Sequence, residues 1–130
     1  MSVKRFLLWL VILLFVAGIT LFLLMGQQIK KLEKQDYGLV DITSMPDGIY
    51  EGNASAVLVT ARVEVSIQDG HIQQVKLLEH QHGSGHGAQA LCDSIVEANN
   101  LDVDSISGAT ISSTVVKAAV FDALKSKATQ

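Results

Sequence analysis

Residues 57–70 read VLVTARVEVSIQDG. From position 57 to position 67 every second residue is apolar, and most of the residues between them are polar. This alternation is typical of a strand with one buried face. Asp69-Gly70 then supplies a two-residue hairpin turn, and residues 71–79 are expected to return as the partner strand. The stretch therefore predicts an antiparallel hairpin at the centre of the fold.

Two helices and two short strands are expected around this hairpin. Residues 49–51 and residues 103–106 are each short enough for one more strand. Apolar residues recur at helical spacing in two segments. They are Ala88, Leu91, Cys92 and Ile95 in the first, and Val116, Ala119 or Val120, and Ala123 or Leu124 in the second. The predicted class is α+β, a small antiparallel sheet packed with two helices.

An apolar segment precedes these elements. The hydrophobic fraction of 48% and the mean hydropathy of +0.33 are high for a soluble chain of 130 residues. The excess lies between Phe6 and Met25, where no residue is charged. As a helix this run spans ~30 Å, the thickness of a bilayer core. A secretory signal has a shorter apolar core of ~7 to 15 residues and a small-residue cleavage site, so an uncleaved transmembrane anchor is favoured over a signal sequence.

The chain therefore divides into three parts: an N-terminal transmembrane anchor over residues 1–26, a juxtamembrane stalk over 27–45 and a folded domain over 46–130. Basic residues flank the anchor on both sides, so the positive-inside rule does not decide which end of the anchor faces the cytoplasm. The short N-terminal tail has nothing to fold, which favours a cytoplasmic N-terminus and an outer domain. From residue 36 onward there are twelve acidic and five basic residues. Such a domain repels nucleic acid, and that class of partner is excluded.

Residues 104–113 read DSISGATISS and resemble a phosphate site. Gly108 allows a close backbone approach or a positive φ, and the hydroxyl run that follows opens a helical segment. Ser112 and Ser113 are candidate helix caps, and Thr110 would lie at the positive end of the helix dipole. Taken alone, the same pattern also fits an ordinary helix cap.

The resemblance extends beyond this turn. Asp104-x-x-Ser107-Gly108-Ala109-Thr110 is similar to the attachment motif of the FMN-binding domain family. Residues 47–52 (DGIYEG) resemble the family's DGxYxG, residues 69–72 (DGHI) its DGxI hairpin, and residues 101–104 (LDVD) its approach to the turn. The resemblance covers about residues 46 to 127. The chain departs from the family at residues 53–56, where a further glycine is common, and at Asn99-Asn100, where Gln-Ser is common.

The resemblance implies FMN attached to Thr110 by a flavin transferase that uses FAD as donor, with Ser107, Gly108, Ala109, Ser112 and Ser113 around the cofactor. Asp104 would cap the turn or serve recognition by the transferase. The domain would lie on the outer face of the cytoplasmic membrane and swing on its stalk. It would carry electrons from a membrane donor, a quinol or a reductase subunit, to an external acceptor. The alternatives are noncovalent FMN binding, a small flavin reductase, and an accessory subunit that lost the cofactor.

Three histidines lie in the glycine-rich loop before the first domain helix, at positions 80, 82 and 86. They could bind a transition metal, be exposed in a flexible loop, or line the flavin pocket as the resemblance implies. His82 is the candidate flavin contact. Tyr50 would lean on the flavin or fill the sheet edge. Cys92, the only cysteine, is expected in the core, and no metal site is predicted.

Overall fold

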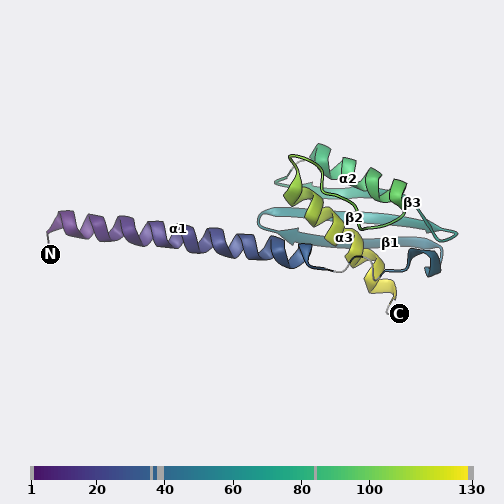
Figure 1. The fold of residues 1–130 in the computed structure, drawn as a ribbon, viewed down its shortest axis with the longest axis horizontal. Helices are drawn as coiled ribbons and strands as arrows, with labels where there is room; N and C mark the ends of the chain where they lie inside the picture. The colour runs from purple at the N-terminus through teal and green to yellow at the C-terminus, as the bar shows by residue number, and fades with distance from the viewer. Residues whose placement is uncertain (1, 36, 38–39, 84, 129–130) are drawn as a thin grey trace.

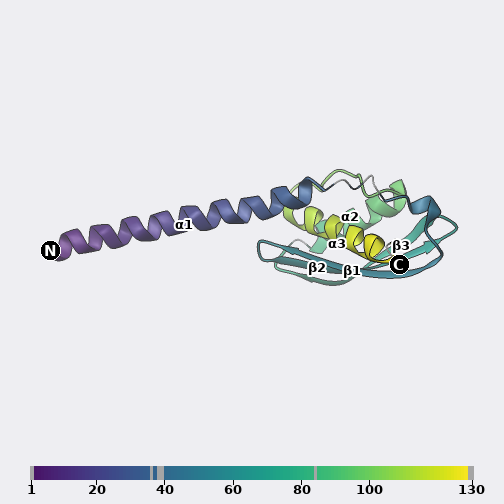
Figure 2. The ribbon, with the colours of Figure 1, turned by 90° about the horizontal axis from the view of Figure 1, so that it is seen from below.

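The computed structural model describes residues 2–35, 37, 40–83 and 85–128. It contains a long N-terminal helix, three strands in one antiparallel sheet, and two further helices (Figure 1). The expected α+β class is confirmed. The two helices of the domain lie together over one face of the sheet, as Figure 2 shows from below.

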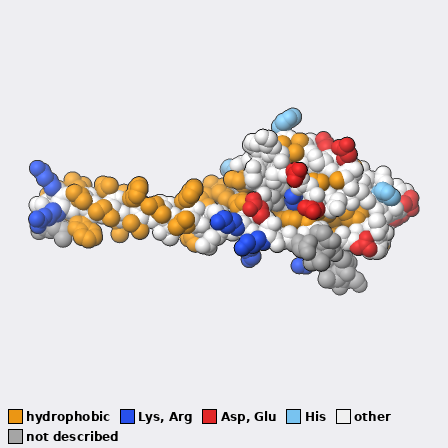
Figure 3. All heavy atoms as spheres, viewed as in Figure 1, with side chains coloured by type: hydrophobic (Ala, Val, Ile, Leu, Met, Phe, Trp, Pro, Cys, Tyr) orange, Lys and Arg blue, Asp and Glu red, His pale blue; other side chains and the backbone are white. Residues whose placement is uncertain are grey.

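Helix α1 (Val3–Glu33) has 31 residues and is about 46 Å long. Its side chains between positions 3 and 24 are exposed and almost all apolar (Figure 3). It is long and apolar enough to span a membrane. The helix continues two turns past Met25, and Lys30 and Lys31 lie in its last turn.

The segment predicted as a stalk packs against the domain. Tyr37, Ile42 and Met45 are buried in the same core as the sheet, and Ile29 and Leu32 of α1 are partly buried against it. The Tyr37 hydroxyl donates a hydrogen bond to the Leu32 carbonyl over 2.7 Å. The short 3-10 helix η2 (Ile42–Ser44) follows. The expectation of a swinging domain does not fit this packing, because apolar burial holds the chain after α1 on the domain.

The sheet has the order β1-β2-β3, formed by β1 (Gly48–Ala56), β2 (Val59–Gln68) and β3 (His71–Gln81). The hairpin at Asp69-Gly70 is confirmed, and both residues have positive φ, as a type I′ turn requires. Several strand boundaries differ from prediction, and β3 ends at Gln81, two residues later than expected. β1 runs on to Ala56, and Val57-Leu58 form the turn to β2 instead of its first residues. Because this turn has two residues and both are apolar, the alternation of apolar and polar residues along β2 reads on through it, and the periodicity did not reveal the turn.

Helices α2 (Gly85–Ala98) and α3 (Thr110–Ala128) cover the sheet, α2 against β3 and α3 against β1 and β2. The predicted inner faces of both helices are buried, Cys92 included. β1 and α3 approach so closely at Gly52 that an added Cβ would lie 2.3 Å from the backbone nitrogen of Ala123. Any side chain at Gly52 would separate the two elements, which explains the last glycine of the DGIYEG stretch.

No strand forms at 103–106 in the part of the chain that the structure describes, so that prediction was wrong. The segment runs as a loop on the side of the helices away from the sheet (Figure 2). Its backbone groups bond locally instead of to the sheet: the Ile106 amide donates to Ser113 Oγ over 2.9 Å, and the Val103 carbonyl accepts from Lys117 Nζ. Short apolar runs do not distinguish a strand from an extended loop that is held in this way.

Candidate functional site

A tight turn leads into α3. The Ala109 amide donates to the Ile106 carbonyl over 3.0 Å, and Gly108 at the third position has a φ of 78°. This is the geometry of a type II turn, which requires glycine or asparagine at that position. The Ser113 amide then donates to the Ala109 carbonyl over 2.9 Å and starts the helix. Thr110 is the first helical residue, and its side chain is exposed.

The serines that follow do not cap the helix. A capping residue precedes the first helical position, whereas Ser112 and Ser113 lie inside the first turn and are buried. Ser113 Oγ accepts from the Ile106 amide and so fixes the turn, not the helix end. Ser112 Oγ lies 3.2 Å from Nε2 of His80. The predicted caps are therefore wrong, and both hydroxyls instead connect α3 to the segments packed beside it.

A cavity of about 450 Å³ lies at this helix end. Three segments form its walls: the first residue of β2, the loop after β3, and the turn that opens α3. The described residues that line it are Val59, His82, Gly83, Gly108, Ala109, Thr110, Ile111 and Ser112. The structure thus brings His82 to Thr110, although they are far apart in sequence. The volume is in the range of small-molecule sites in proteins.

Gly83 fits closely between the cavity and the chain behind it. An added Cβ would lie 2.4 Å from Ser112 Oγ and 2.9 Å from Cε1 of His80. Ser112 is buried, so its side chain has little room to move away. The loop at His82 and Gly83 therefore sits against the first turn of α3 only because residue 83 lacks a side chain. The sequence analysis named the glycine-rich histidine loop but selected only His82 from it as a flavin contact, and it missed Val59.

The chemistry of the cavity suits a phosphorylated, planar ligand. The N–H groups in the first turn of a helix have no partner within the helix and carry the positive end of its dipole. Among the described residues that line the cavity there is no lysine, arginine, aspartate or glutamate. Glycine at 108, where an added Cβ would meet nothing within 4 Å, lets the backbone approach a flat ring. An FMN phosphate at Thr110 with its ring toward His82 fits these residues.

The other predicted residues lie elsewhere. Tyr50 is buried, its hydroxyl donates to the Pro46 carbonyl over 2.6 Å, and its cross-strand partner is Val65. Because Val65 is six residues along β2 from Val59, Tyr50 is roughly 20 Å from the cavity wall. Asp104 and Ser107 are exposed on the loop and turn before α3 and do not line the cavity. In the described part of the chain the Asp104 carboxylate has no hydrogen bond or ion pair.

The histidine loop separates into different environments. His82 lines the cavity with a positive φ of 60°, His80 contacts Ser112, and His86 is exposed in the first turn of α2. Among the residues described, no three His, Cys, Asp or Glu side chains are grouped in a way that could hold a metal ion.

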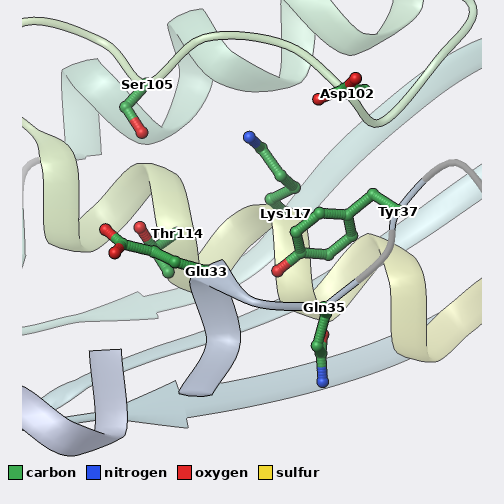
Figure 4. A pocket seen from close by; sticks show the side chains of 7 residues that line it. All are labelled: Glu33, Gln35, Tyr37, Asp102, Ser105, Thr114 and Lys117. Carbon is green, nitrogen blue, oxygen red and sulfur yellow. The ribbon is translucent and has the colours of Figure 1, made fainter. Parts of the chain in front are cut away.

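A second cavity, of about 220 Å³, lies between the end of α1, α3 and the loop before α3 (Figure 4). Lys117 Nζ donates to the Val103 carbonyl there and lies 5.5 Å from the centre of the Tyr37 ring. Burial, with the charge of Glu33, raises the pKa of Tyr37 to about 12. The carboxylates of Glu33 and Asp102 line this cavity and would repel a phosphate. The cavity at Thr110 is therefore the candidate site.

Comparison with known protein families gives a match over the region that contains the cavity at Thr110. The sequence model of the FMN-binding domain matches residues 59–125. This range runs from the first residue of β2 into the last turns of α3 and contains every described residue of the cavity at Thr110. The DGIYEG stretch lies before it. A search of curated proteins found no match. The match covers more than half of the chain, and the chain therefore belongs to the FMN-binding domain family, with FMN as its cofactor.

Proposed function

We propose that this protein is a membrane-anchored electron carrier whose FMN is bound covalently to Thr110. The observation that carries the proposal is the position of Thr110. It is exposed, it is the first residue of α3, and it borders the cavity beside Gly108 and His82. Its hydroxyl is thus accessible to an attaching enzyme, while a phosphate on that oxygen would lie at the helix N-terminus.

The attachment is a phosphoryl-group transfer. The Thr110 hydroxyl oxygen attacks the phosphorus of FAD that carries the riboflavin, and a P–O bond to Thr110 forms. The P–O bond of the pyrophosphate breaks, AMP leaves, and the threonine proton is released. No oxidant or reductant is required. A flavin transferase supplies the catalysis, and the exposed, unpaired Asp104 carboxylate six residues earlier is accessible for its recognition.

A covalent bond compensates for the weak electrostatic attraction between this site and a free phosphate. A free phosphomonoester carries a charge of about −1.5 to −2 at neutral pH, and the helix end supplies only about +0.5. The described lining offers no lysine or arginine, and the domain has an acidic excess. Esterification to Thr110 lowers the phosphate charge to about −1 and removes the need for tight reversible binding. The ester also keeps the flavin on the domain where reversible binding is weak.

The transport role follows from the cofactor and the anchor. Bound FMN accepts and gives up one or two electrons, and hydrogen bonds and exposure set its potential. We place the domain on the outer side of the cytoplasmic membrane, between a membrane donor, a quinol or a reductase subunit, and an external acceptor. Because Tyr37, Ile42 and Met45 pack the segment after α1 onto the domain, its partners come to a site held near the membrane.

The test is flavin fluorescence of the denatured protein band together with intact mass, after expression with an FAD-dependent flavin transferase. The wild-type band should fluoresce and carry the mass of FMN less one water. Thr110→Val, which keeps the shape and removes the hydroxyl, should be dark. Thr60→Val on β2 is the matched control and should fluoresce.

Two results would contradict the proposal. The first is a Thr110→Val band that still carries the added mass. The second is a dark wild-type band whose flavin is released by acid precipitation, which would establish noncovalent binding.

A further inference from the structure

We propose that the end of the domain that holds the flavin cavity rests on the lipid bilayer that α1 crosses, with Leu58 inserted among the lipids. The inference rests on the part of the proposed function in which α1 is a membrane anchor. It adds the surface through which the domain meets the membrane and the direction in which the cavity opens.

The turn between β1 and β2 (Val57-Leu58) lies at the end of the domain that is nearest to the apolar part of α1. The Val57 amide donates to Gln28 Oε1 over 2.9 Å. Gln28 is three residues past Met25, where the uncharged run of α1 ends, and this distance along the helix is roughly 4.5 Å. The turn is therefore held at the level of the lipid headgroups. Figures 1 and 2 both show this turn and the start of α3 at the end of the domain nearest to α1.

The turn has an unusual composition. Two-residue hairpin turns favour glycine, asparagine and aspartate, but this one consists of Val57 and Leu58. Val57 has a φ of 61°, in a region that β-branched residues rarely adopt. The side chain of Leu58 is 69% exposed. An apolar tip kept in a strained turn is unfavourable in water and favourable where lipid covers it.

The neighbouring segments carry no fixed charge. Residues 52–61, 80–92 and 105–116 contain no aspartate, glutamate, lysine or arginine. These segments supply the turn, the loop after β3 and the start of α3, which together form the cavity. Ile111 in the cavity wall is a second exposed apolar side chain at this end. These three segments of an acidic domain thus present uncharged side chains to the bilayer, while the exposed Lys30 and Lys31 of α1 can bind anionic headgroups.

This arrangement bears on electron transfer. The cavity at Thr110 opens beside the lipid surface, so a redox partner reaches it at the membrane boundary. An integral membrane protein is the other possible occupant of this end. The bilayer is favoured because Gln28 fixes the turn to the anchor itself, at a height where lipid is already present.

The experiment measures the depth of single tryptophans in the full chain, reconstituted into phosphatidylcholine and phosphatidylglycerol vesicles. Trp9 of the wild-type chain should be quenched by lipids brominated in their acyl chains, which reports that α1 is inserted. In a Trp9→Phe background, Leu58→Trp places the probe at the turn. Ile49→Trp is the matched control, because Ile49 is 60% exposed at the opposite end of β1.

The probe at position 58 should emit at shorter wavelength and be roughly twofold weaker in brominated than in unbrominated vesicles, since interfacial side chains lie ~5–10 Å deep. The probe at position 49 should be unaffected. Each variant is measured from one preparation in brominated and in unbrominated vesicles, so any quenching of tryptophan by bound flavin is the same in both and cancels. Equal emission from position 58 in both lipids would overturn the proposal and leave this end to a protein partner. Equal quenching at positions 58 and 49 would overturn it too, because the domain would then lie flat.

If Trp9 itself escapes quenching, the membrane anchor fails and the inference fails with it. Flavin attachment to Thr110 is measured separately on the same preparations and does not depend on the result.

Discussion

The backbone amide of Val57 donates a hydrogen bond to Oε1 of Gln28 over 2.9 Å. One residue belongs to the β1–β2 turn and the other to α1, so this bond joins the sheet to the helix that precedes the domain. Together with the buried Tyr37, it places the domain at a fixed position on the helix end. The relation of the flavin site to the membrane depends on this junction.

Removal of this bond should loosen the turn. In Gln28→Ala the Val57 amide loses its acceptor, and its hydrogen exchange should accelerate up to about tenfold, because such bonds contribute about 0.5–1.5 kcal/mol. Hydrogen–deuterium exchange followed by mass spectrometry of the peptide over 53–60 measures this. Gln27→Ala, at an exposed neighbouring position, is the control and should leave the peptide unchanged. Equal exchange in both variants would show that the bond does not hold the turn.

Gly83→Ala should damage the flavin site. Its Cβ would lie 2.4 Å from the buried Ser112 Oγ, so the loop must move away from α3. We expect a loss of about 1–3 kcal/mol in the free energy of unfolding and reduced flavin attachment. Thermal unfolding and in-gel fluorescence measure the two effects. Gly85→Ala is the matched control, because an added Cβ there meets nothing within 4 Å; a similar loss in that variant would contradict the steric explanation.

His82 should influence the flavin potential. It is the one titratable side chain among the described residues that line the cavity. If it bonds the flavin, His82→Gln should shift the midpoint potential by on the order of 20–30 mV, equivalent to one hydrogen bond. Spectroelectrochemical titration of the flavin-loaded protein measures the shift. His71→Gln, at the far end of β3, should have no effect. Equal potentials in both variants would remove His82 from the flavin contacts.

The protein should lose stability in alkaline solution. Burial, with the charge of Asp93, raises the pKa of Cys92 to about 11, and burial with Glu33 raises that of Tyr37 to about 12. The unfolded chain releases these protons at lower pH than the folded one. The Cys92 contribution to the free energy of unfolding should therefore be lost between about pH 9 and pH 11, and that of Tyr37 between about pH 10 and pH 12, by at most about 3 kcal/mol per group.

Urea unfolding of the full chain in detergent micelles, from pH 8 to pH 10.5, measures this decline. Cys92→Ala should be less stable at every pH, because it leaves a small cavity. Its stability should nevertheless fall less steeply with pH than that of the wild type. Parallel pH profiles for the two proteins would show that the Cys92 thiol does not contribute.

Local patterns were enough to predict most elements of this fold. The alternation along residues 59–67 and the Asp69-Gly70 turn predicted the central hairpin, and the helical spacing of Leu91, Ile95, Val116 and Val120 predicted both domain helices. The uncharged run from Phe6 to Met25 predicted the long apolar helix. Each of these signals lies within a few turns or pleats of the chain, where the spacing of apolar residues and the turn chemistry decide the structure.

Only the tertiary structure decided how these elements meet. It placed His82 and Gly83 against Thr110, turned the chain at Val57-Leu58, and packed Tyr37 onto the domain. It also gave Ser113 a role in the turn instead of a cap. These outcomes depend on contacts between residues distant in sequence, such as Gly52 with α3 and Gly83 with Ser112. Such contacts leave no periodic pattern, because close packing selects side-chain size at single positions.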